Sequence, residues 1–246
     1  MTQSHSTTAP IRPATRDGDD AALTRLLEGR YSCRGYRPDP VPRDRIEAML
    51  RMAQNAPSWC NSQPWRVHVT SGEATERFRA GLLAYASSAT DPKSGVPMAP
   101  DMPFPAAYTG IYKERQREVG WQLYESVGVT YGDRVGSARQ MMENFRLFGA
   151  PHALVVTTER DLGVYGAVDC GVYVGCLTLA AQSLGLATIA QAAIAGCAPF
   201  VREFFGLPDH RAVLLGLSLG YADDAHPANG FRSRRAPVAD MLDWVE

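Results

Sequence analysis

The sequence predicts one folded domain in which helices alternate with a few buried strands. Its 246 residues lie near the upper end for a single domain, and 45% of them are hydrophobic, which is ample for one core. Two apolar runs, 152–157 (HALVVT) and 212–221 (AVLLGLSLGY), have the composition of buried strands. Between them, residues 169–184 have helical length and almost no polar face, so we expect a helix buried at the centre of the fold.

The other elements follow from periodicity and from residues that end helices. Apolar residues at helical spacing predict a helix over 20–30, with Asp19 or Asp20 as its cap and Gly29 near its end. A second helix should begin at Asp44 and stop at Pro57. Residues 65–70 alternate between apolar and polar side chains, which predicts a strand. Residues 73–85 and 110–126 predict helices, the second of them with one aromatic face. The run 91–108 predicts a long loop or lid, 187–189 a short strand, and 201–205 a helix.

Charge and cysteine content argue against several classes of protein. A net charge of -1 gives no global field that would attract nucleic acid or an anionic membrane. The five cysteines form no CxxC pair and the five histidines show no ligand spacing, which argues against a metal site and against a disulfide framework. We therefore expect a cytoplasmic protein.

The two ends of the chain differ in composition. Residues 1–20 are rich in Ser, Thr, Pro and Asp, which predicts a flexible arm and not a signal peptide. Residues 21–246 then form the single domain. No later segment is expected to be long and apolar enough to span a membrane.

Two dense basic segments, 30–34 (RYSCR) and 231–237 (FRSRRAP), lie near opposite ends of the chain. Alternate side chains of an extended segment share a face, so Arg30, Ser32 and Arg34 should point to one side. Two guanidinium groups and a hydroxyl suit the oxygens of a phosphate. All but two of the 25 basic residues are arginines, so a solvated loop and a solvated tail remain the alternatives.

Two other segments suit a planar heteroaromatic ring. The loop 56–65 (APSWCNSQPW) carries the amides of Asn61 and Gln63, which offer donors and acceptors to the edge of a pyrimidine-like ring. An ordinary turn beside a buried Trp65 is the alternative. The small residues Ala190–Ala193 would let a ring lie against the backbone, with a main-chain N–H free to donate; simple close packing is the alternative there.

In this order, these segments resemble the FMN-dependent nitroreductase family. The resemblance runs from about Leu23 to the C-terminus, and residues 148–151 and 215–221 are similar to the branch that contains nitrobenzoate reductases. It implies an α+β fold with a central, mostly antiparallel sheet between helices, assembled as an intertwined homodimer with two FMN sites at the interface. The helix over 169–184 would form the dimer core, and the chain after Pro237 would be exchanged as an edge strand. The matching motifs are Arg30-x-Ser32-x-Arg34, Pro57-Ser58-x-x-Asn61-Ser62-Gln63-Pro64-Trp65, Gln191-Ala192-Ala193 and Arg232-x-x-Arg235-Ala236-Pro237.

The resemblance also implies roles for the matched residues. Arg30, Ser32 and Arg235 would bind the phosphate of FMN. Arg34 would lie beside N1 and the C2 carbonyl of the flavin, where a fixed positive charge stabilises the reduced anion. Asn61 would hold the pyrimidine edge. The other residues expected at the cofactor are Tyr31, Pro57, Ser58, Gln63, Gln191, Ala192, Ala193 and Arg232, and those expected on the substrate side, from the partner subunit, are Tyr112, Trp121 and Tyr124.

The activity implied is transfer of hydride from NAD(P)H through FMN to a flat, electron-poor acceptor such as a nitroaromatic, in a ping-pong cycle. The cofactor would carry the chemistry, so no side-chain nucleophile and no metal are required. A Ser-His-Asp hydrolase is not expected, on the view that the chain lacks a GxSxG nucleophile elbow. Two alternatives stay open. One is an FMN-dependent oxidase or dehydrogenase acting on another small substrate, and the other is a flavin-binding protein without turnover.

Overall fold

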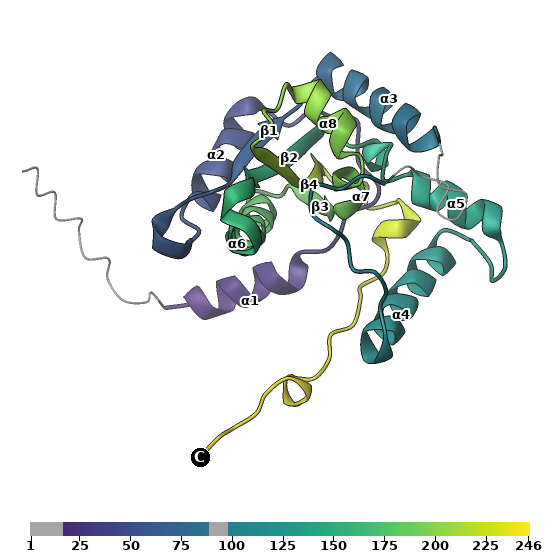
Figure 1. The fold of residues 1–246 in the computed structure, drawn as a ribbon. Coiled ribbons are helices and arrows are strands. Elements are labelled where there is room, and N and C mark those ends of the chain that lie inside the picture. Colours follow the sequence, from purple (N-terminus) through teal and green to yellow (C-terminus); the bar gives the residue numbers. More distant parts are fainter. Residues whose placement is uncertain (1–16, 89–97) are drawn as a thin grey trace, which may run out of the picture.

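The computed structural model describes residues 17–88 and 98–246 and has a four-stranded sheet at its centre. The strands are β1 (Arg66–Val69), β2 (His152–Glu159), β3 (Ala187–Gln191) and β4 (Arg211–Gly220). They lie in the order β1-β2-β4-β3, and each neighbouring pair is antiparallel (Figure 1). The expected α+β fold with a mostly antiparallel sheet is confirmed. Residues 1–16, within the expected arm, and 89–97, which include the start of the expected lid, lie outside the described residues.

The central strands are apolar throughout because both faces of the sheet are covered. In β2, Ala153 and Val155 belong to one hydrophobic core, whereas Leu154 and Val156 belong to the other. Successive side chains of a strand point to opposite faces, so a strand buried on both sides has no polar alternation. This is the physical reason that the run 152–157 can be recognised from sequence.

Different helices cover the two faces of the sheet. On one face, α2 (Arg43–Ala53) packs against α6 (Gly163–Ser183), and Tyr173 of α6 stacks on Trp65 with ring centroids 4.7 Å apart. On the other face, α3 (Glu73–Ser87) packs against α8 (Ala198–Phe205), which follows the short α7 (Ala192–Ala195). Phe78 of α3 is fully buried there, within 6 Å of three phenylalanine rings of α8.

Helix α6 corrects two sequence-based expectations. It begins at Gly163, six residues before the expected start, and it is not buried on all sides. Val164, Tyr165, Val168 and Val172 are exposed by 69%, 56%, 53% and 41%, so one face of α6 is apolar and uncovered. Among the described residues, Arg160–Ser183 is also long and apolar enough to cross a membrane, contrary to expectation, although half of its apolar window is buried in the chain as in the core helix of many soluble proteins.

The remaining elements lie around one end of the sheet. Helix α1 (Asp19–Gly29) begins two residues inside the expected arm, and the residue before it is Gly18 at φ 88°, so neither Asp19 nor Asp20 caps it. Helix α4 (Gly110–Ser126) has the expected bounds, and α5 (Arg134–Met142) was not predicted. After β4 the chain runs past α4 and ends away from the sheet (Figure 1). Beyond Pro237 its described residues form a short 3-10 turn, Val238–Asp240, and no strand, so the exchange of a strand stays a prediction.

Candidate functional site

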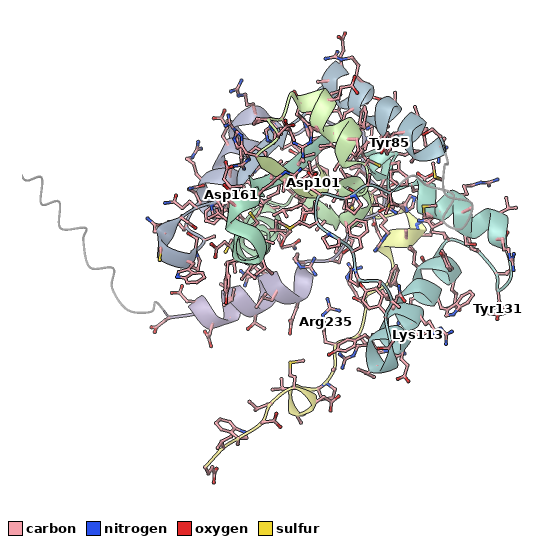
Figure 2. The ribbon with its side chains drawn as sticks, viewed as in Figure 1. Tyr85, Asp101, Lys113, Tyr131, Asp161 and Arg235 are labelled. Carbon is pink, nitrogen blue, oxygen red and sulfur yellow. The ribbon has the colours of Figure 1, made fainter. Side chains whose placement is uncertain are left out.

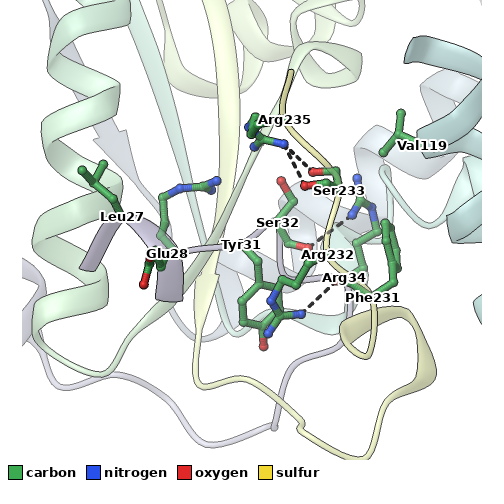
Figure 3. Close-up of a pocket in the computed structure, with 11 residues that line it drawn as sticks. Leu27, Glu28, Tyr31, Ser32, Arg34, Val119, Phe231, Arg232, Ser233 and Arg235 are labelled. Atoms are coloured by element: carbon green, nitrogen blue, oxygen red, sulfur yellow. Dashed lines mark hydrogen bonds between the residues drawn. The ribbon is translucent and has the colours of Figure 1, made fainter. Parts of the chain in front are cut away.

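The two basic segments meet in one cavity of about 350 Å³. One wall is the extended stretch that follows α1, and the other is the C-terminal segment after the 3-10 turn Pro227–Asn229, with α4 alongside (Figure 3). Residues 30 and 235, far apart in the sequence, therefore face the same space, and Figure 2 shows Arg235 between α1 and α4. The lining residues are Leu27, Glu28, Arg30, Tyr31, Ser32, Arg34, Val119, Phe231, Arg232, Ser233 and Arg235.

Backbone pairing places the first basic stretch beside the sheet. Ser32 forms a parallel bridge with Thr188 of β3, and the Cys33 N–H donates to the Thr188 carbonyl at 3.1 Å. Because side chains alternate along an extended segment, the fully buried Cys33 points into the core while its neighbours Ser32 and Arg34 face the cavity. Arg30, Ser32 and Arg34 all line the cavity, as a shared face requires, and the intervening Tyr31 lines it as well.

Four guanidinium groups surround this cavity without an acidic partner. In the described part of the chain, no carboxylate forms an ion pair with Arg30, Arg34, Arg232 or Arg235. Burial lowers the pKa of Arg30, and the positive charge of Arg235 lowers it further, which shows that these two cations are close. Burial also lowers the pKa of Arg34. Four guanidinium groups against one carboxylate in the lining, that of Glu28, give the cavity an excess of positive charge, which suits a multiply charged anion.

Two of the expected cofactor ligands are engaged with each other. The guanidinium carbon of Arg232 lies 3.7 Å from the centre of the Tyr31 ring, the geometry of a cation–π contact. Arg232 also donates to the backbone carbonyls of Asn229 and Phe231. The Tyr31–Arg232 pair therefore joins the two walls of the cavity, and Arg30, Arg34 and Arg235 line the space between them. Nη1 of Arg235 donates to Ser233 and to the Arg234 carbonyl, which holds this side chain at the cavity.

The loop between α2 and β1 is strained and firmly anchored. Cys60, Asn61 and Gln63 have φ values of 51°, 55° and 46°, which cost non-glycine residues about 1–3 kcal/mol each. The carboxylate of Asp169 on α6, only 8% exposed, accepts hydrogen bonds from the Trp59 N–H and the Ser62 hydroxyl. Strain held in place by a buried carboxylate is typical of a loop whose shape serves binding.

The expected ligands of this loop do not line the cationic cavity of the same chain. Pro57, Ser58, Asn61 and Gln63 are all absent from its lining. The Ser58 hydroxyl accepts from the Gln63 N–H at 3.0 Å, so its own proton remains free to donate. The side-chain amide of Gln63 is used within the loop, since its Oε1 accepts from Gln54 and its Nε2 donates to Asn61. A direct ligand role for the Gln63 side chain has no support in these contacts.

The turn from β3 into α7 presents backbone and not a side chain. Gln191 is 2% exposed, with Nε2 donating to the Asn144 carbonyl at 2.8 Å and Oε1 accepting from the Ser218 hydroxyl at 2.6 Å. Ala192 is exposed and Ala193 is half-buried. The side chain of Gln191 therefore fixes this turn from below, and contact with a ligand here falls to the backbone and to the two alanines.

Ser218 lies in a sequence motif that is also found in hydrolases. Residues 216–220 (GLSLG) have the GxSxG spacing of a hydrolase nucleophile elbow, contrary to the expectation that this motif is absent from the sequence. An elbow requires an exposed serine at a sharp turn from strand to helix. Ser218 instead lies within β4, is 0% exposed, and donates to Gln191. It is a structural residue.

The aromatic residues of α4 that are expected on the substrate side of the partner subunit's site do not line the cavity of their own chain. Tyr112 and Trp121 of α4 are exposed by 64% and 40%, and the Trp121 ring packs on Tyr124 of the same helix. The residue of α4 that does reach the cavity is Val119. Sequence reasoning missed Val119 and the supporting Asn229, neither of which belongs to a pattern that stands out in one sequence. It also gave no role to Phe231, although Phe231 begins the second basic segment.

Comparisons with known proteins identify the family of this chain. The model of the family described as "Nitroreductase family" matches residues 27–221. Nitroreductase NfnB of Mycolicibacterium smegmatis is 33% identical over 89% of this chain and 91% of its own, and 4-nitrobenzoate reductase of Nocardioides sp. is 33% identical over 95% of each. The crystal structure of the FMN-dependent NfnB from Mycobacterium smegmatis in complex with NADPH has a TM-score of 0.86 and 31% identity, covering 92% of this chain and 99% of that one. This chain belongs to the nitroreductase family.

Proposed function

We propose that this protein is an FMN-dependent oxidoreductase that takes hydride from NAD(P)H and gives it to a flat, electron-poor acceptor such as a nitroaromatic, in a ping-pong cycle. The observation that carries the proposal is the cavity in which Arg30, Arg34 and Arg235 converge without a carboxylate partner. Relatives described as 4-nitrobenzoate reductase, nitrobenzene nitroreductase and FMN-dependent nitroreductase support the same chemistry.

The cavity suits the phosphate of FMN in both charge and geometry. A phosphate monoester carries about -1.5 to -2 charges near neutral pH and has three strong acceptor oxygens. Arg30 and Arg235 provide guanidinium donors from opposite walls, and Ser32 adds a hydroxyl between them. The mutual repulsion of the two cations lowers the pKa of Arg30, and a bound dianion would relieve that repulsion.

Arg34 is suited to a different part of the cofactor. Bound FMN would supply hydride transfer at its ring system, and reduction leaves negative charge on the pyrimidine side of the flavin. The Arg34 guanidinium is partly desolvated, and its Nη1 is steadied by the Ser32 carbonyl at 3.3 Å. A cation held in this way stabilises such negative charge more strongly than it would in water.

A homodimer would bring the remaining ligands to the cavity. The loop with Ser58 and Asn61 lies next to the uncovered apolar face of α6, because Trp59 contacts Tyr165 with ring centroids 4.4 Å apart. Packing this face against a second copy would bury Val164, Val168 and Val172 and carry the loop onto the partner subunit. The loop of one protomer would then complete the cationic cavity of the other.

Anaerobic flavin spectroscopy tests the proposed function. The purified protein is expected to show flavin absorbance that NADH or NADPH bleaches and that a nitrobenzoate then restores. Flavin that neither nucleotide reduces would contradict the reductase assignment and favour an oxidase or a flavin-binding protein without turnover. A protein that binds no FMN at all would contradict the cofactor assignment itself.

A further inference from the structure

A chain of side-chain hydrogen bonds runs from the core to the strained loop. The Trp65 Nε1–H donates to Gln54 Oε1 at 3.1 Å, and Gln54 Nε2 donates to Gln63 Oε1 at 2.8 Å. Gln63 Nε2 then donates to Asn61 Oδ1 at 3.1 Å and to the Asn61 carbonyl at 3.3 Å. We call these four residues, Trp65, Gln54, Gln63 and Asn61, the amide chain.

The direction of the amide chain is fixed at its buried end. Amide nitrogen and oxygen are hard to tell apart by shape, so the orientation of a lone Asn or Gln is ambiguous. An indole N–H, however, can only donate. Trp65 is 9% exposed and stacked on Tyr173, so its N–H is held in place and obliges Gln54 to present Oε1. Each following amide is then oriented in turn.

The last amide is left with a free donor. Asn61 Oδ1 is occupied by Gln63, and within residues 17–88 and 98–246 no acceptor takes the protons of Asn61 Nδ2. Asn61 itself is exposed in the single chain. Its Nδ2 can therefore donate to an acceptor on a ligand. Oδ1 already accepts from Gln63, so placing Oδ1 on the ligand side instead of Nδ2 would require the amide chain to reverse.

We propose that Trp65, Gln54 and Gln63 are positioning residues that hold Asn61 as a hydrogen-bond donor to a pyrimidine carbonyl oxygen of the bound flavin. This inference rests on the proposed function and adds the polarity of the contact. A donor at a carbonyl oxygen stabilises the electron-rich reduced ring more than the oxidised ring. The amide chain therefore favours flavin reduction from a residue, Gln54, that does not touch the cofactor.

The variant Gln54→Glu tests this polarity because it reverses the chain without changing its shape. A carboxylate accepts from both Trp65 and Gln63, so Gln63 must turn its Nε2 toward position 54 and its Oε1 toward Asn61. Asn61 then donates to Gln63 and presents Oδ1 to the ligand. We expect FMN to bind about tenfold more weakly, its carbonyl stretching band to move to higher wavenumber, and its midpoint potential to become more negative.

Two control variants separate polarity from charge and from packing. Asn55→Asp adds the same charge at the adjacent position, outside the amide chain, where Asn55 donates only to the Arg51 and Met52 carbonyls. Its carbonyl band should match that of the unchanged protein. Trp65→Phe keeps a ring against Tyr173 but removes the donor that sets the direction, so its FMN affinity should lie between those of the unchanged protein and Gln54→Glu.

The outcomes distinguish this inference from the proposed function. A Gln54→Glu protein whose carbonyl band equals that of Asn55→Asp would overturn the inference while leaving flavin binding intact. If the unchanged protein binds no FMN, the proposed function fails, and NMR on the apoprotein still decides the orientation. There, the Nε2 protons of Gln63 should show contacts to the β-protons of Asn61; contacts from Asn61 Nδ2 protons to the γ-protons of Gln63 would overturn the inference.

Discussion

Asn229 and Arg34 are joined by a hydrogen bond that spans 195 positions of sequence: the Arg34 backbone N–H donates to Asn229 Oδ1 at 2.7 Å. Asn229 is 5% exposed, and its Nδ2 donates to the carbonyls of Gly35 and Asp223, each at 2.9 Å. One buried amide therefore ties the start of the C-terminal basic segment to the first basic stretch. The shape of the cationic cavity depends on this tie.

The variant Asn229→Ala should loosen the cavity and weaken the fold. It leaves the partly buried Arg34 N–H without its partner, which costs about 1–3 kcal/mol of the free energy of unfolding, whereas the Gly35 carbonyl still accepts from the Asp223 N–H at 3.0 Å. We expect FMN affinity to fall about tenfold as Arg34 loses its position. Urea unfolding and flavin titration measure the two effects. Asn55→Ala is the control, and equal FMN affinity in the two variants would show that the tie does not shape the site.

The variant Arg235→Ala should weaken the binding of FMN far more than that of riboflavin. Arg235 faces the cavity, whereas its neighbour Arg234 lies at 3.4 Å from Glu118 on the outside, so Arg234→Ala is a matched control. A charge-assisted hydrogen bond contributes about 1.5–3 kcal/mol, so the FMN dissociation constant should rise roughly 10- to 100-fold. Fluorescence titration with both flavins measures this. Equal losses for FMN and riboflavin would place Arg235 away from the phosphate.

Removal of the Arg34 side chain should act on reduction of the flavin as well as on its binding. With Arg34→Ala the positive charge near the pyrimidine side is lost, so the midpoint potential should become more negative and reduction by NAD(P)H slower. Arg34→Lys keeps the charge without the planar donors and should recover part of the potential. Anaerobic redox titration and stopped-flow absorbance measure both quantities. An unchanged potential in Arg34→Ala would remove Arg34 from this role.

The apolar face of α6 should be an interface between two copies of the chain. Val168→Glu places a charge in the middle of this face, and we expect it to yield monomers that lose FMN, since each site would need the loop of the partner. Val135→Glu on α5 is a control because Val135 is exposed by 72% and lies away from α6. Analytical ultracentrifugation with flavin absorbance decides the matter; a monomeric unchanged protein that retains FMN would contradict the dimer.

Much of the fold was predictable because it follows from local pattern. β2 and β4 can be recognised as apolar runs because both of their faces are covered. α4 was predicted from the spacing of its aromatic and charged residues. α5 was missed because its nine residues, RVGSARQMM, have no regular apolar stripe for periodicity to detect. Composition alone did not show that one face of α6 is exposed in the single chain, because it indicates that a helix avoids water but not which molecule covers it.

The residues of the candidate site could be predicted where they lie together in short sequence motifs. Arg30 and Arg235 stood out because phosphate binding concentrates basic residues in short segments. Asn229 and Gln54 act through single hydrogen bonds to partners that the fold brings near, and a lone amide in a sequence carries no such signal. For the same reason, the sequence did not show that the side-chain amides of Gln63 and Gln191 form hydrogen bonds within the protein instead of with a ligand.

The stability of the fold should fall with decreasing pH in part through His152. This residue is 2% exposed; its Nε2 accepts from the Val41 N–H at 2.9 Å, so the proton sits on Nδ1, which donates to the Thr70 carbonyl at 3.1 Å. Burial lowers the pKa of His152, and the hydrogen bond that the ring donates to the Thr70 carbonyl acts in the opposite direction. The folded state therefore binds fewer protons than the unfolded state once the pH falls below the usual pKa of about 6.5.

That difference in proton binding fixes the sign of the pH dependence. The contribution of His152 is complete above pH ~6.5 and is lost as the pH falls toward the lowered pKa of the folded state, with a slope of at most about 1.4 kcal/mol per pH unit for one group. His152→Gln removes this titration, whereas His68, whose pKa is also lowered by burial, titrates in both proteins and cancels in the comparison. Urea unfolding from pH 8 to pH 5 should show a steeper decline for the unchanged protein than for His152→Gln. Parallel declines would mean that protonation of His152 does not break its bond to Val41.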